Sequence, residues 1–389
     1  MIRSTDRILV THQGTLPRPA DVREMVLAKD GGKPVDEALL TRRLREAIAD
    51  NVKHQLEVGI DSVNDGELSK SSFSNYARLR LGGVHEREIR PTDPPRRGVS
   101  QRDAQEFGGY FRGRSGFTGV VSGTIQQRIV CDAPLTYIGM ETTQADIANF
   151  KAALAGIDGV QEAYLPAVAP GTIEHWLQND YYPDSEKFLF ALADAMHEEY
   201  KAIVEAGFLL QIDDPDLPDG YQMFPEFSVD DYRRYAELRV DALNHALRDI
   251  PSDRVRFHMC WGSYKGPHKY DLPLADIVDV MLKIKADAYS IEQSNPMHAH
   301  EWRVFEDVKL PAGKTLIPGV IGHASDFIES PELVADRLLN YAKLVGRENV
   351  MAGTDCGIGS RVGQPGIAWA KFQSMSRGAE LASKQLWGR

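Results

Sequence analysis

Short hydrophobic runs alternate along the chain with stretches whose apolar residues recur at helical spacing. Residues about 36–58 show this spacing clearly, and a run at 60–67 that ends in polar residues follows Gly59. Strand, helix and strand in this order form the repeat of a parallel α/β fold. With one hairpin set aside, the pattern predicts eight strands, at about 7–11, 61–65, 163–168, 208–213, 255–260, 288–292, 315–320 and 349–354.

Further helices are predicted between these strands, at about 143–154, 185–206, 229–247, 274–285, 331–345 and 367–387. Eight strands, each followed by a helix or a long loop, predict a (β/α)8 TIM barrel of the α/β class. The alternative is a doubly wound open sheet, which usually carries a glycine-rich dinucleotide loop after its first strand. Gly14 stands alone at that position, so the pattern favours the barrel.

Residues 82–139 interrupt the alternation and are predicted to be an insertion within a single barrel domain that spans residues 1–389. Residues about 82–118 are rich in Arg, Pro and Gly and show little periodicity, which predicts a long loop. Residues 120–139 are predicted to form a β-hairpin. The loop is either a solvated mobile segment or a lid that binds an anionic substrate through its arginines, Arg87, Arg90, Arg96, Arg97, Arg112 and Arg114.

The composition is that of a soluble globular protein, with 42% hydrophobic and 26% charged residues among 389. The net charge of −11 argues against a nucleic-acid or anionic-membrane surface. No apolar run approaches the ~18–20 residues that span a bilayer, and the N-terminus lacks the apolar segment of a signal peptide. Three cysteines, an odd number, suit a reducing environment better than a disulfide framework, so we expect a cytoplasmic protein.

Polar residues concentrate at the carboxyl ends of the predicted strands, where a (β/α)8 barrel places its chemistry. They are His12, Asp65, Glu67, Asp213, Asp214, His258, Cys260, Glu292, Asp355 and Cys356. A single acidic residue after a strand is commonly a helix cap or a solvated loop group. Their occurrence at the same end of most strands points instead to a functional site.

Four of these residues could together bind a metal ion. His258 and Cys260 lie two residues apart on one strand, so their side chains point to the same face. Glu292 and Cys356 end two later strands and complete a set of two thiolates, one imidazole and one carboxylate, which favours zinc. The alternative is that both cysteines are buried packing residues, the commoner fate of a free cysteine. We interpret Cys131, on the predicted hairpin, in that way.

Six stretches, in the same order along the chain, resemble the C-terminal catalytic domain of cobalamin-independent methionine synthase. They are His12-Gln13-Gly14-Thr15-Leu16-Pro17-Arg18-Pro19, Asp65-Gly66-Glu67, Gln211-Ile212-Asp213-Asp214-Pro215, His258-Met259-Cys260, Ser290-Ile291-Glu292-Gln293-Ser294 and Thr354-Asp355-Cys356-Gly357. Other stretches resemble the single-barrel members of that superfamily typified by epoxyalkane:coenzyme M transferase, among them Cys260-Trp261-Gly262 with Gly266-Pro267-His268, Asn295-Pro296 with His300-Glu301-Trp302, and Gly346-Arg347-Glu348-Asn349. The resemblance covers almost the whole chain.

The resemblance implies a Zn2+ barrel that binds a small thiol on the metal and alkylates its sulfur. By motif position, the metal ligands would be His258, Cys260, Glu292 and Cys356. The substrate-binding residues would be Gly14, Thr15, Glu67 and Asp213, the last two at positions that hold the amino group of homocysteine in methionine synthase. The catalytic candidates are His12, His323 and Asp355. The expected partners are the thiol, an alkyl donor and further copies of this chain, without nucleic acid or membrane.

One departure from methionine synthase concerns the methyl donor. Methionine synthase carries a histidine in the loop after its seventh strand, proposed to assist proton transfer to the folate leaving group, whereas here His323 is displaced by one residue and Ala324 takes the aligned place. The sequence therefore argues against folate-dependent methionine synthesis. An epoxide donor would need an acid, for which the candidates are His12, His268, His298 and His323. Methionine synthase activity, a zinc-dependent lyase or hydrolase, and a non-catalytic barrel with structural zinc are the alternatives.

Overall fold

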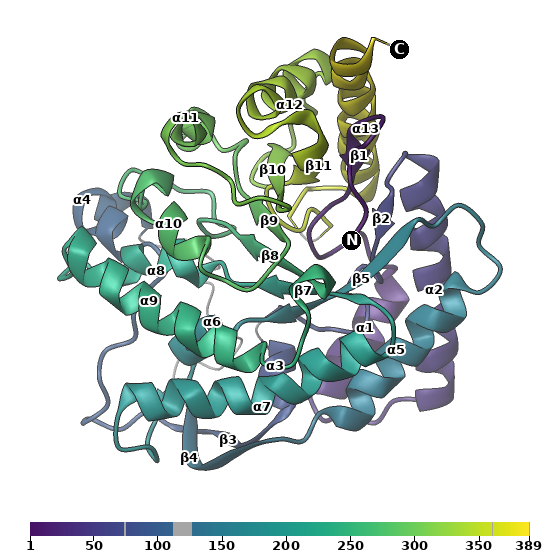
Figure 1. Cartoon of the computed structure of the whole chain (residues 1–389). Coiled ribbons are helices and arrows are strands. Elements are labelled where there is room, and N and C mark those ends of the chain that lie inside the picture. The colour runs from purple at the N-terminus through teal and green to yellow at the C-terminus, as the bar shows by residue number, and fades with distance from the viewer. Residues whose placement is uncertain (74, 112–126, 360, 389) are drawn as a thin grey trace.

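The computed structural model describes residues 1–73, 75–111, 127–359 and 361–388 (Figure 1). Its main sheet has eight parallel strands in the order β1-β11-β10-β9-β8-β7-β5-β2. Their bounds are Leu9–Val10 (β1), Ser62–Val63 (β2), Glu162–Val168 (β5), Leu209–Asp213 (β7), Val255–Met259 (β8), Ala288–Ile291 (β9), Thr315–Ile321 (β10) and Met351–Thr354 (β11). All eight predicted strands are confirmed.

The first two strands of the chain close this sheet into a barrel. The amide of Asp61, just before β2, donates to the carbonyl of Val10 in β1 at 2.8 Å. The Thr11 hydroxyl adds a second link by donating to the Ser62 carbonyl at 3.1 Å. The barrel predicted from the sequence is therefore the fold, and the open doubly wound sheet is excluded.

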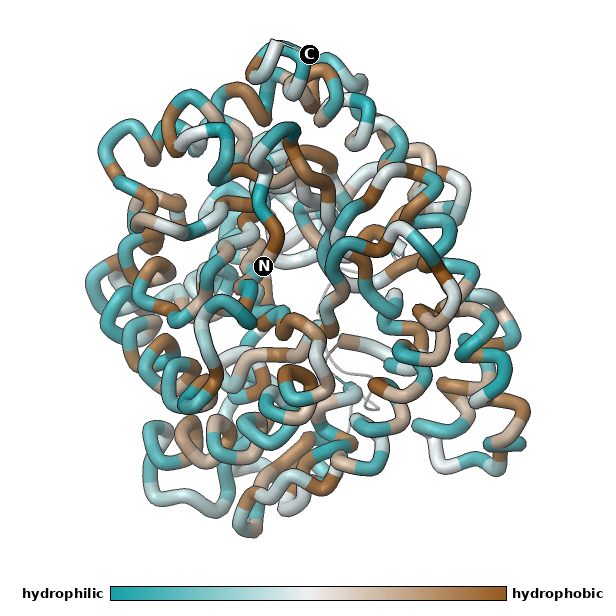
Figure 2. The backbone as a smooth tube through the Cα atoms, turned by 45° about the vertical axis from the view of Figure 1, so that its right-hand side comes forward, coloured by the Kyte–Doolittle hydropathy of each residue, from teal (hydrophilic) through white to brown (hydrophobic). Residues whose placement is uncertain are grey.

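Helices surround the barrel, and Figure 2 shows hydrophobic and hydrophilic residues alternating along them, as expected where one face of each helix is buried. Their bounds are Ala20–Asp30 (α1), Glu37–Glu57 (α2), Met140–Leu154 (α5), Pro170–Trp176 (α6), Ser185–Glu205 (α7), Asp216–Met223 (α8), Val229–Ala246 (α9), Val278–Met281 (α10), Val304–Asp307 (α11), Pro331–Val345 (α12) and Pro365–Trp387 (α13). None of the helices in the described ranges combines the length and apolar composition that crossing a bilayer requires.

Side-chain caps fix where several of these helices begin. Asp36 accepts from the Leu39 amide and Asp184 from the Lys187 amide, while Ser228 forms a reciprocal capping box with Asp231. The helix predicted at about 274–285 is wrong in its length. Only a 3-10 turn and the four-residue α10 form there, because Ile277 between them has a non-helical φ of −132°.

The barrel interior is part apolar and part polar. Leu9, Ala288, Ile317 and Met351 form a small apolar cluster that is separate from the main core between barrel and helices. Arg256, on β8 and 1% exposed, lies 4.1 Å from the centre of the Tyr164 ring and donates to Thr11 Oγ1 at 2.9 Å. A buried cation within the barrel is thus held by π and hydrogen-bond contacts.

The insertion differs from its prediction. A second sheet contains β3 (Leu81–Glu88), β4 (Gln127–Tyr137) and β6 (Gln178–Asn179), with β3 and β4 antiparallel. The predicted loop at 82–118 is therefore wrong where it covers β3 and the helix α4 (Gln101–Phe111). The hairpin is right in its second strand, but the partner of that strand is β3. The predicted first strand at 120–124 lies outside the described residues, and the insertion within a single domain stays a prediction.

The arginines of the insertion that the structure describes are engaged within the fold. Arg87 forms ion pairs with Asp93 at 2.7 Å and with Asp180 at 2.8 Å. Arg90 also pairs with Asp180, Arg96 donates to the Gln127 carbonyl, and Arg97 pairs with Glu226. Arg112 and Arg114 lie outside the described residues. The predicted binding of an anionic substrate therefore gains no support from these four side chains.

Candidate metal centre

Three of the four predicted metal ligands meet at the carboxyl end of the barrel. His258 is part of β8, Cys260 follows that strand, and Cys356 follows β11. One ligand atom from each of the three lies within 4.8 Å of the other two. His258 and Cys260 are buried, and Cys356 is half-buried. The side-chain alternation of a strand explains why the two β8 residues face the same way.

The electrostatics of this cluster suit a metal ion. Both ring nitrogens of His258 are buried without a hydrogen-bond partner, which is costly unless a ligand completes the site. The Cys260 thiol, followed by the His258 ring, holds the pKa of Cys356 well below its usual range. Hydrogen bonding with Cys356 and burial raise the pKa of Cys260. Two sulfur atoms and one imidazole nitrogen form a donor set that fits zinc.

Glu292, the fourth predicted ligand, borders this cluster without belonging to it. It forms a second group with His323 and Asp355, whose ligand atoms also lie within 4.8 Å of one another. Its Oε2 accepts from the Trp261 amide at 2.7 Å, and its Oε1 accepts from Asn295 Nδ2 at 3.1 Å. Each oxygen keeps lone-pair capacity beyond these bonds.

Asp355 fastens the loop that carries Glu292. Its Oδ1 accepts from the amides of Gln293 and Ser294 at 2.8 and 2.9 Å, and its Oδ2 accepts from the Ser294 hydroxyl. Burial, followed by the charge of Glu292, raises the pKa of Asp355 to about 8. With its oxygens occupied in this way, Asp355 orients the loop after β9.

His323 is the predicted catalytic residue whose ring the structure leaves available. It follows β10, is 1% exposed, and neither ring nitrogen has a partner. The preceding residue, Gly322, approaches the same region closely, because a Cβ there would lie 2.9 Å from the Ser294 hydroxyl. His323 therefore faces the acidic side of the metal centre with both nitrogens free to bond.

Two carboxyl groups that were predicted to bind substrate lie at the same, carboxyl, end of the barrel as the metal cluster. Glu67 follows β2, and its Oε2 is buried without a hydrogen-bond partner 3.8 Å from Lys70 Nζ. Burial, which outweighs the attraction of Lys70, raises the pKa of Glu67 to about 7. Burial also raises the pKa of Asp213, the last residue of β7, to about 6. The negative charge of Cys356 adds to the rise in the pKa of both carboxyl groups.

The loop after β1 lies between Glu67 and Cys356. Gly14 has a φ of +64°, and a Cβ at this position would lie 2.5 Å from Glu67 Oε1, so only glycine fits. Thr15 approaches Gly357, since a Cβ at Gly357 would lie 2.7 Å from the Thr15 nitrogen. This loop therefore joins the metal end of the site to its carboxylate end.

His12, the remaining catalytic candidate, faces away from the barrel interior. Its Nε2 lies 2.9 Å from Gln55 Oε1 on α2, and its ring packs 5.5 Å from that of Phe372 on α13. Burial lowers the pKa of His12 to about 3, so the ring is neutral. The structure places it in the layer between barrel and helices, apart from the metal cluster.

Several contributors to the site escaped prediction. The Ser263 hydroxyl donates to Cys356 Sγ at 3.4 Å, and Trp261 and Asn295 donate to Glu292. Lys70 follows Glu67 by three residues, a spacing that would have signalled an ion pair on a turn.

Cys131, which was predicted to be a packing residue, is buried in β4 and donates to the Ala133 carbonyl at 3.3 Å.

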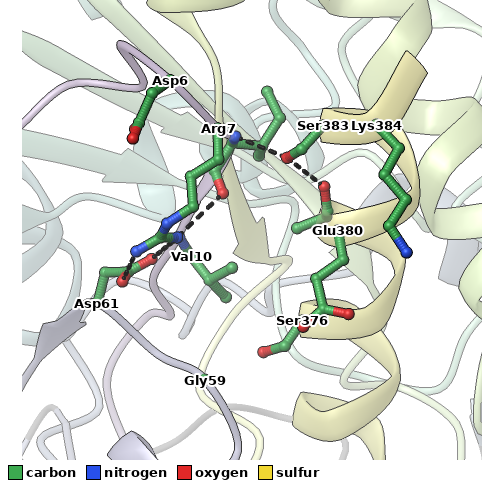
Figure 3. Close-up of a pocket in the computed structure, with 11 residues that line it drawn as sticks. Asp6, Arg7, Val10, Gly59, Asp61, Ser376, Glu380, Ser383 and Lys384 are labelled. Atoms are coloured by element: carbon green, nitrogen blue, oxygen red, sulfur yellow. Dashed lines mark hydrogen bonds and ion pairs between the residues drawn. The ribbon is translucent and has the colours of Figure 1, made fainter. Parts of the chain in front are cut away.

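A separate cavity of about 500 Å³ opens at the amino ends of β1 and β2, beside α13 (Figure 3). Some of its polar groups bond to one another: Arg7 pairs with Asp61, and the Ile8 amide donates to the Ser383 hydroxyl. It contains none of the predicted site residues. The chemistry predicted from the sequence therefore belongs to the other end of the barrel.

Comparison with known proteins shows which family the chain belongs to. Residues 132–380 match the model of the family described as "Cobalamin-independent synthase, Catalytic domain". The chain belongs to the cobalamin-independent synthase family. Curated relatives include methionine synthases from Sulfurisphaera tokodaii, 24% identical over 96% of this chain and 92% of the relative, and from Pyrococcus horikoshii, 23% identical with the same coverage.

Solved structures share the fold. The B12-independent methionine synthase from Shewanella sp. W3-18-1, in complex with selenomethionine, superposes with a TM-score of 0.72 at 19% identity, covering 98% of this chain and all of that one. A methyltransferase from Methanosarcina mazei gives 0.54 at 14% identity, covering 97% and 94%. The named relatives are methionine synthases, so the finer resemblance to epoxyalkane:coenzyme M transferase stays a prediction.

Proposed function

We propose that this protein is a zinc-dependent alkyl- or methyltransferase that alkylates the sulfur of a small thiol carrying an amino group. The observation that carries the proposal is the cluster of His258, Cys260 and Cys356 at the carboxyl end of the barrel. Glu67 and Asp213 lie at the same end of the barrel, and the charge of Cys356 contributes to the raised pKa of both. A metal-binding end suits sulfur, and a carboxylate end suits an ammonium group.

At the metal end, His258, Cys260 and Cys356 would hold zinc, with Glu292 as the predicted fourth ligand. When bound, zinc supplies Lewis acidity, which lowers the pKa of a coordinating thiol and keeps its sulfur nucleophilic at neutral pH. Asp355 fixes the loop of Glu292 through three hydrogen bonds, and the Ser263 hydroxyl orients Cys356.

At the carboxylate end, Glu67 and Asp213 would accept the substrate ammonium group. The unpartnered Oε2 of Glu67 is the acceptor that such a group would satisfy, and Lys70 favours its ionised form. The Shewanella protein holds selenomethionine, an amino acid, and an amino acid is the kind of molecule that two carboxylates and a metal-bound sulfur would accommodate.

His323 is the proposed proton donor to the departing group of the alkyl donor. A buried imidazole with two unpartnered nitrogens has the geometry for this role, since neither nitrogen must first give up another bond. Glu292 and Asp355 lie beside it, with ligand atoms of the three residues within 4.8 Å of one another. His12 is not proposed for this role, because its ring faces the helical layer.

A second candidate is methionine synthesis itself, which the names of the curated relatives favour. The two are separated by assaying the zinc-loaded protein with homocysteine and either methyltetrahydrofolates or small electrophiles such as epoxides. Loss of free thiol in any of these arms supports sulfur alkylation, and the active donor decides between the candidates. Turnover of a substrate in the absence of every thiol would instead support a lyase or hydrolase and would overturn the proposal.

A further inference from the structure

Trp261 connects the metal centre to a buried charged cluster behind it. It follows Cys260 directly, is fully buried, and its amide donates to Glu292 Oε2 at 2.7 Å. Its ring lies parallel to the His298 ring, 3.8 Å between centres and 18° between planes. Its Nε1 donates to the Leu272 carbonyl at 2.7 Å. Both the ring and the amide of Trp261 are therefore fixed.

Two histidines share one carboxylate behind this ring. Asp271 Oδ2 lies 2.7 Å from His268 Nδ1 and 3.1 Å from His298 Nε2. The second nitrogen of His298 lies 2.8 Å from Glu301 Oε2, and that of His268 lies 3.1 Å from the Tyr264 carbonyl. Every ring nitrogen thus faces an oxygen acceptor. A neutral imidazole has only one N–H, so with Asp271 and Glu301 ionised this geometry makes both rings imidazolium cations.

The charges of this cluster agree with that assignment. Burial alone would lower the pKa of His298, but its bonds to Asp271 and Glu301 raise it to about 10. Bonds from both histidines overcome burial and lower the pKa of Asp271. We name His268, Asp271, His298 and Glu301 the imidazolium clamp; it carries two positive and two negative charges, which is why its burial is tolerated.

The clamp is anchored on both sides. Gln222 Nε2 donates to Asp271 Oδ1 at 2.8 Å, and the Leu274 amide donates to Glu301 Oε1 at 2.9 Å. All four clamp residues are less than a tenth exposed. A rigid, satisfied cluster of this kind holds its neighbours in one geometry. The neighbour that it holds here is Trp261.

We infer that the imidazolium clamp, acting through Trp261, is a positioning device for the Glu292 carboxylate and sets the affinity of the centre for a divalent metal. This inference rests on the part of the proposed function that makes Glu292 a ligand. Hydrogen bonds that orient a ligating carboxylate typically contribute 10–100-fold to metal affinity. His268 and His298 are then positioning residues, and neither acts as the acid for the alkyl donor.

The test is a double-mutant cycle on zinc affinity, measured by chelator competition with the full chain in the absence of thiol. His298→Phe keeps a ring against Trp261 but removes the charge and both bonds, and Glu292→Gln removes the carboxylate. Each single change is expected to weaken zinc binding roughly tenfold or more. The double variant is expected to lie within about threefold of Glu292→Gln alone, because both changes remove the same interaction.

His197→Phe is the matched control, since His197 is a buried histidine on α7 that contacts the Ala246 carbonyl and lies outside the clamp. It should leave zinc affinity unchanged. Retention of wild-type affinity by folded His298→Phe, or additive effects in the double variant, would overturn the inference. Because no thiol is present, this outcome is independent of whether the protein alkylates sulfur.

A second measurement covers the case in which His298→Phe does not fold. Nitrogen NMR of the metal-free wild-type protein at pH 8 should show both clamp histidines as imidazolium, with both ring nitrogens protonated. Neutral rings at that pH would contradict the clamp. Trp261→Phe keeps the main-chain donor to Glu292 and a ring on His298, and should therefore bind zinc within about threefold of wild type.

Discussion

The carboxylate of Glu67 rests against Gly14, so closely that a Cβ at Gly14 would lie 2.5 Å from Oε1. This contact fixes the carboxylate against the loop after β1, with Oε2 buried and without a hydrogen-bond partner, 3.8 Å from Lys70 Nζ. A substrate that presents a hydrogen-bond donor there would satisfy this buried oxygen.

Glu67→Gln should lower kcat/KM for homocysteine by roughly 10–100-fold, because a charged hydrogen bond contributes about 1.5–3 kcal/mol. The same change should have little effect on 4-mercaptobutyrate, which lacks the amino group. Since the pKa of Glu67 is raised to about 7, its ionised fraction grows from pH 6 to 8, and its contribution to homocysteine binding should grow with it. Equal losses for both thiols would argue against an ammonium site.

Cys356→Ser should lose most bound zinc, because it removes one of three clustered donors. Metal analysis of the purified protein checks this against a wild-type content of about one zinc per chain. Cys131→Ser is the control: this cysteine is buried in β4, outside the cluster, and its replacement should leave the zinc content unchanged. Full zinc retention by Cys356→Ser would contradict the assignment of Cys356 as a metal ligand.

His323→Gln should reduce kcat by roughly 10²–10⁴ without reducing zinc content, because the change removes a general acid and no ligand. Single-turnover measurements with saturating thiol would isolate the transfer step. A donor whose leaving group needs no proton should be much less sensitive to the change. Unaltered kcat with every donor would remove His323 from the mechanism.

His298 should make stability fall with rising pH. Its folded pKa of about 10 lies above the ordinary value of about 6.5, so its contribution is complete below pH 6.5 and is lost as pH rises toward 10. One such proton corresponds to a slope of about 1.4 kcal/mol per pH unit. Asp355 and Glu67, whose pKa values are also raised, add to the slope of the wild-type protein. Urea unfolding of metal-free protein at pH 7, 8 and 9 should therefore show a slope that is smaller in His298→Phe than in the wild type by up to this amount.

Lys371→Met should destabilise the protein by about 3–5 kcal/mol, since it leaves the largely buried carboxylate of Glu329 without its cation. Lys371 is fully buried and pairs with Glu329 at 2.7 Å, and Glu329 also accepts from the amide of Gly322, beside His323. Thermal unfolding would measure the loss. Adding Glu329→Gln should recover part of it; a double variant less stable than Lys371→Met would contradict the pairing.

The sequence predicted the barrel and its metal end because both depend on local patterns. Apolar runs predicted the eight strands. The i, i+2 spacing of His258 and Cys260 predicted that their side chains point to the same face of one strand. The loop of Glu292 could be placed because parallel strands end at one edge. By contrast, β3 was missed because Leu81–Glu88 is an edge strand with charged and glycine residues, which obscures its alternation.

Features that depend on contacts between distant loops were also missed. The imidazolium clamp joins the segments after β8 and β9, and no periodicity in either segment reveals the pairing. His12 was predicted to be catalytic because it follows a strand. Strand alternation turns Thr11 toward Arg256 in the barrel interior, and thus turns His12 toward α2 and α13. A two-residue strand gives too short a pattern to fix this register beforehand.

The closure of the barrel has a consequence for how the centre is assembled. Cys356 follows β11, the last strand of the chain, which pairs with β1, the first strand. A chain in which β11 has not yet docked would offer the proposed zinc only His258, Cys260 and Glu292, without Cys356. The proposed zinc would therefore meet all of its ligands only once the eighth strand has docked, which would tie metal binding to the last step of barrel closure.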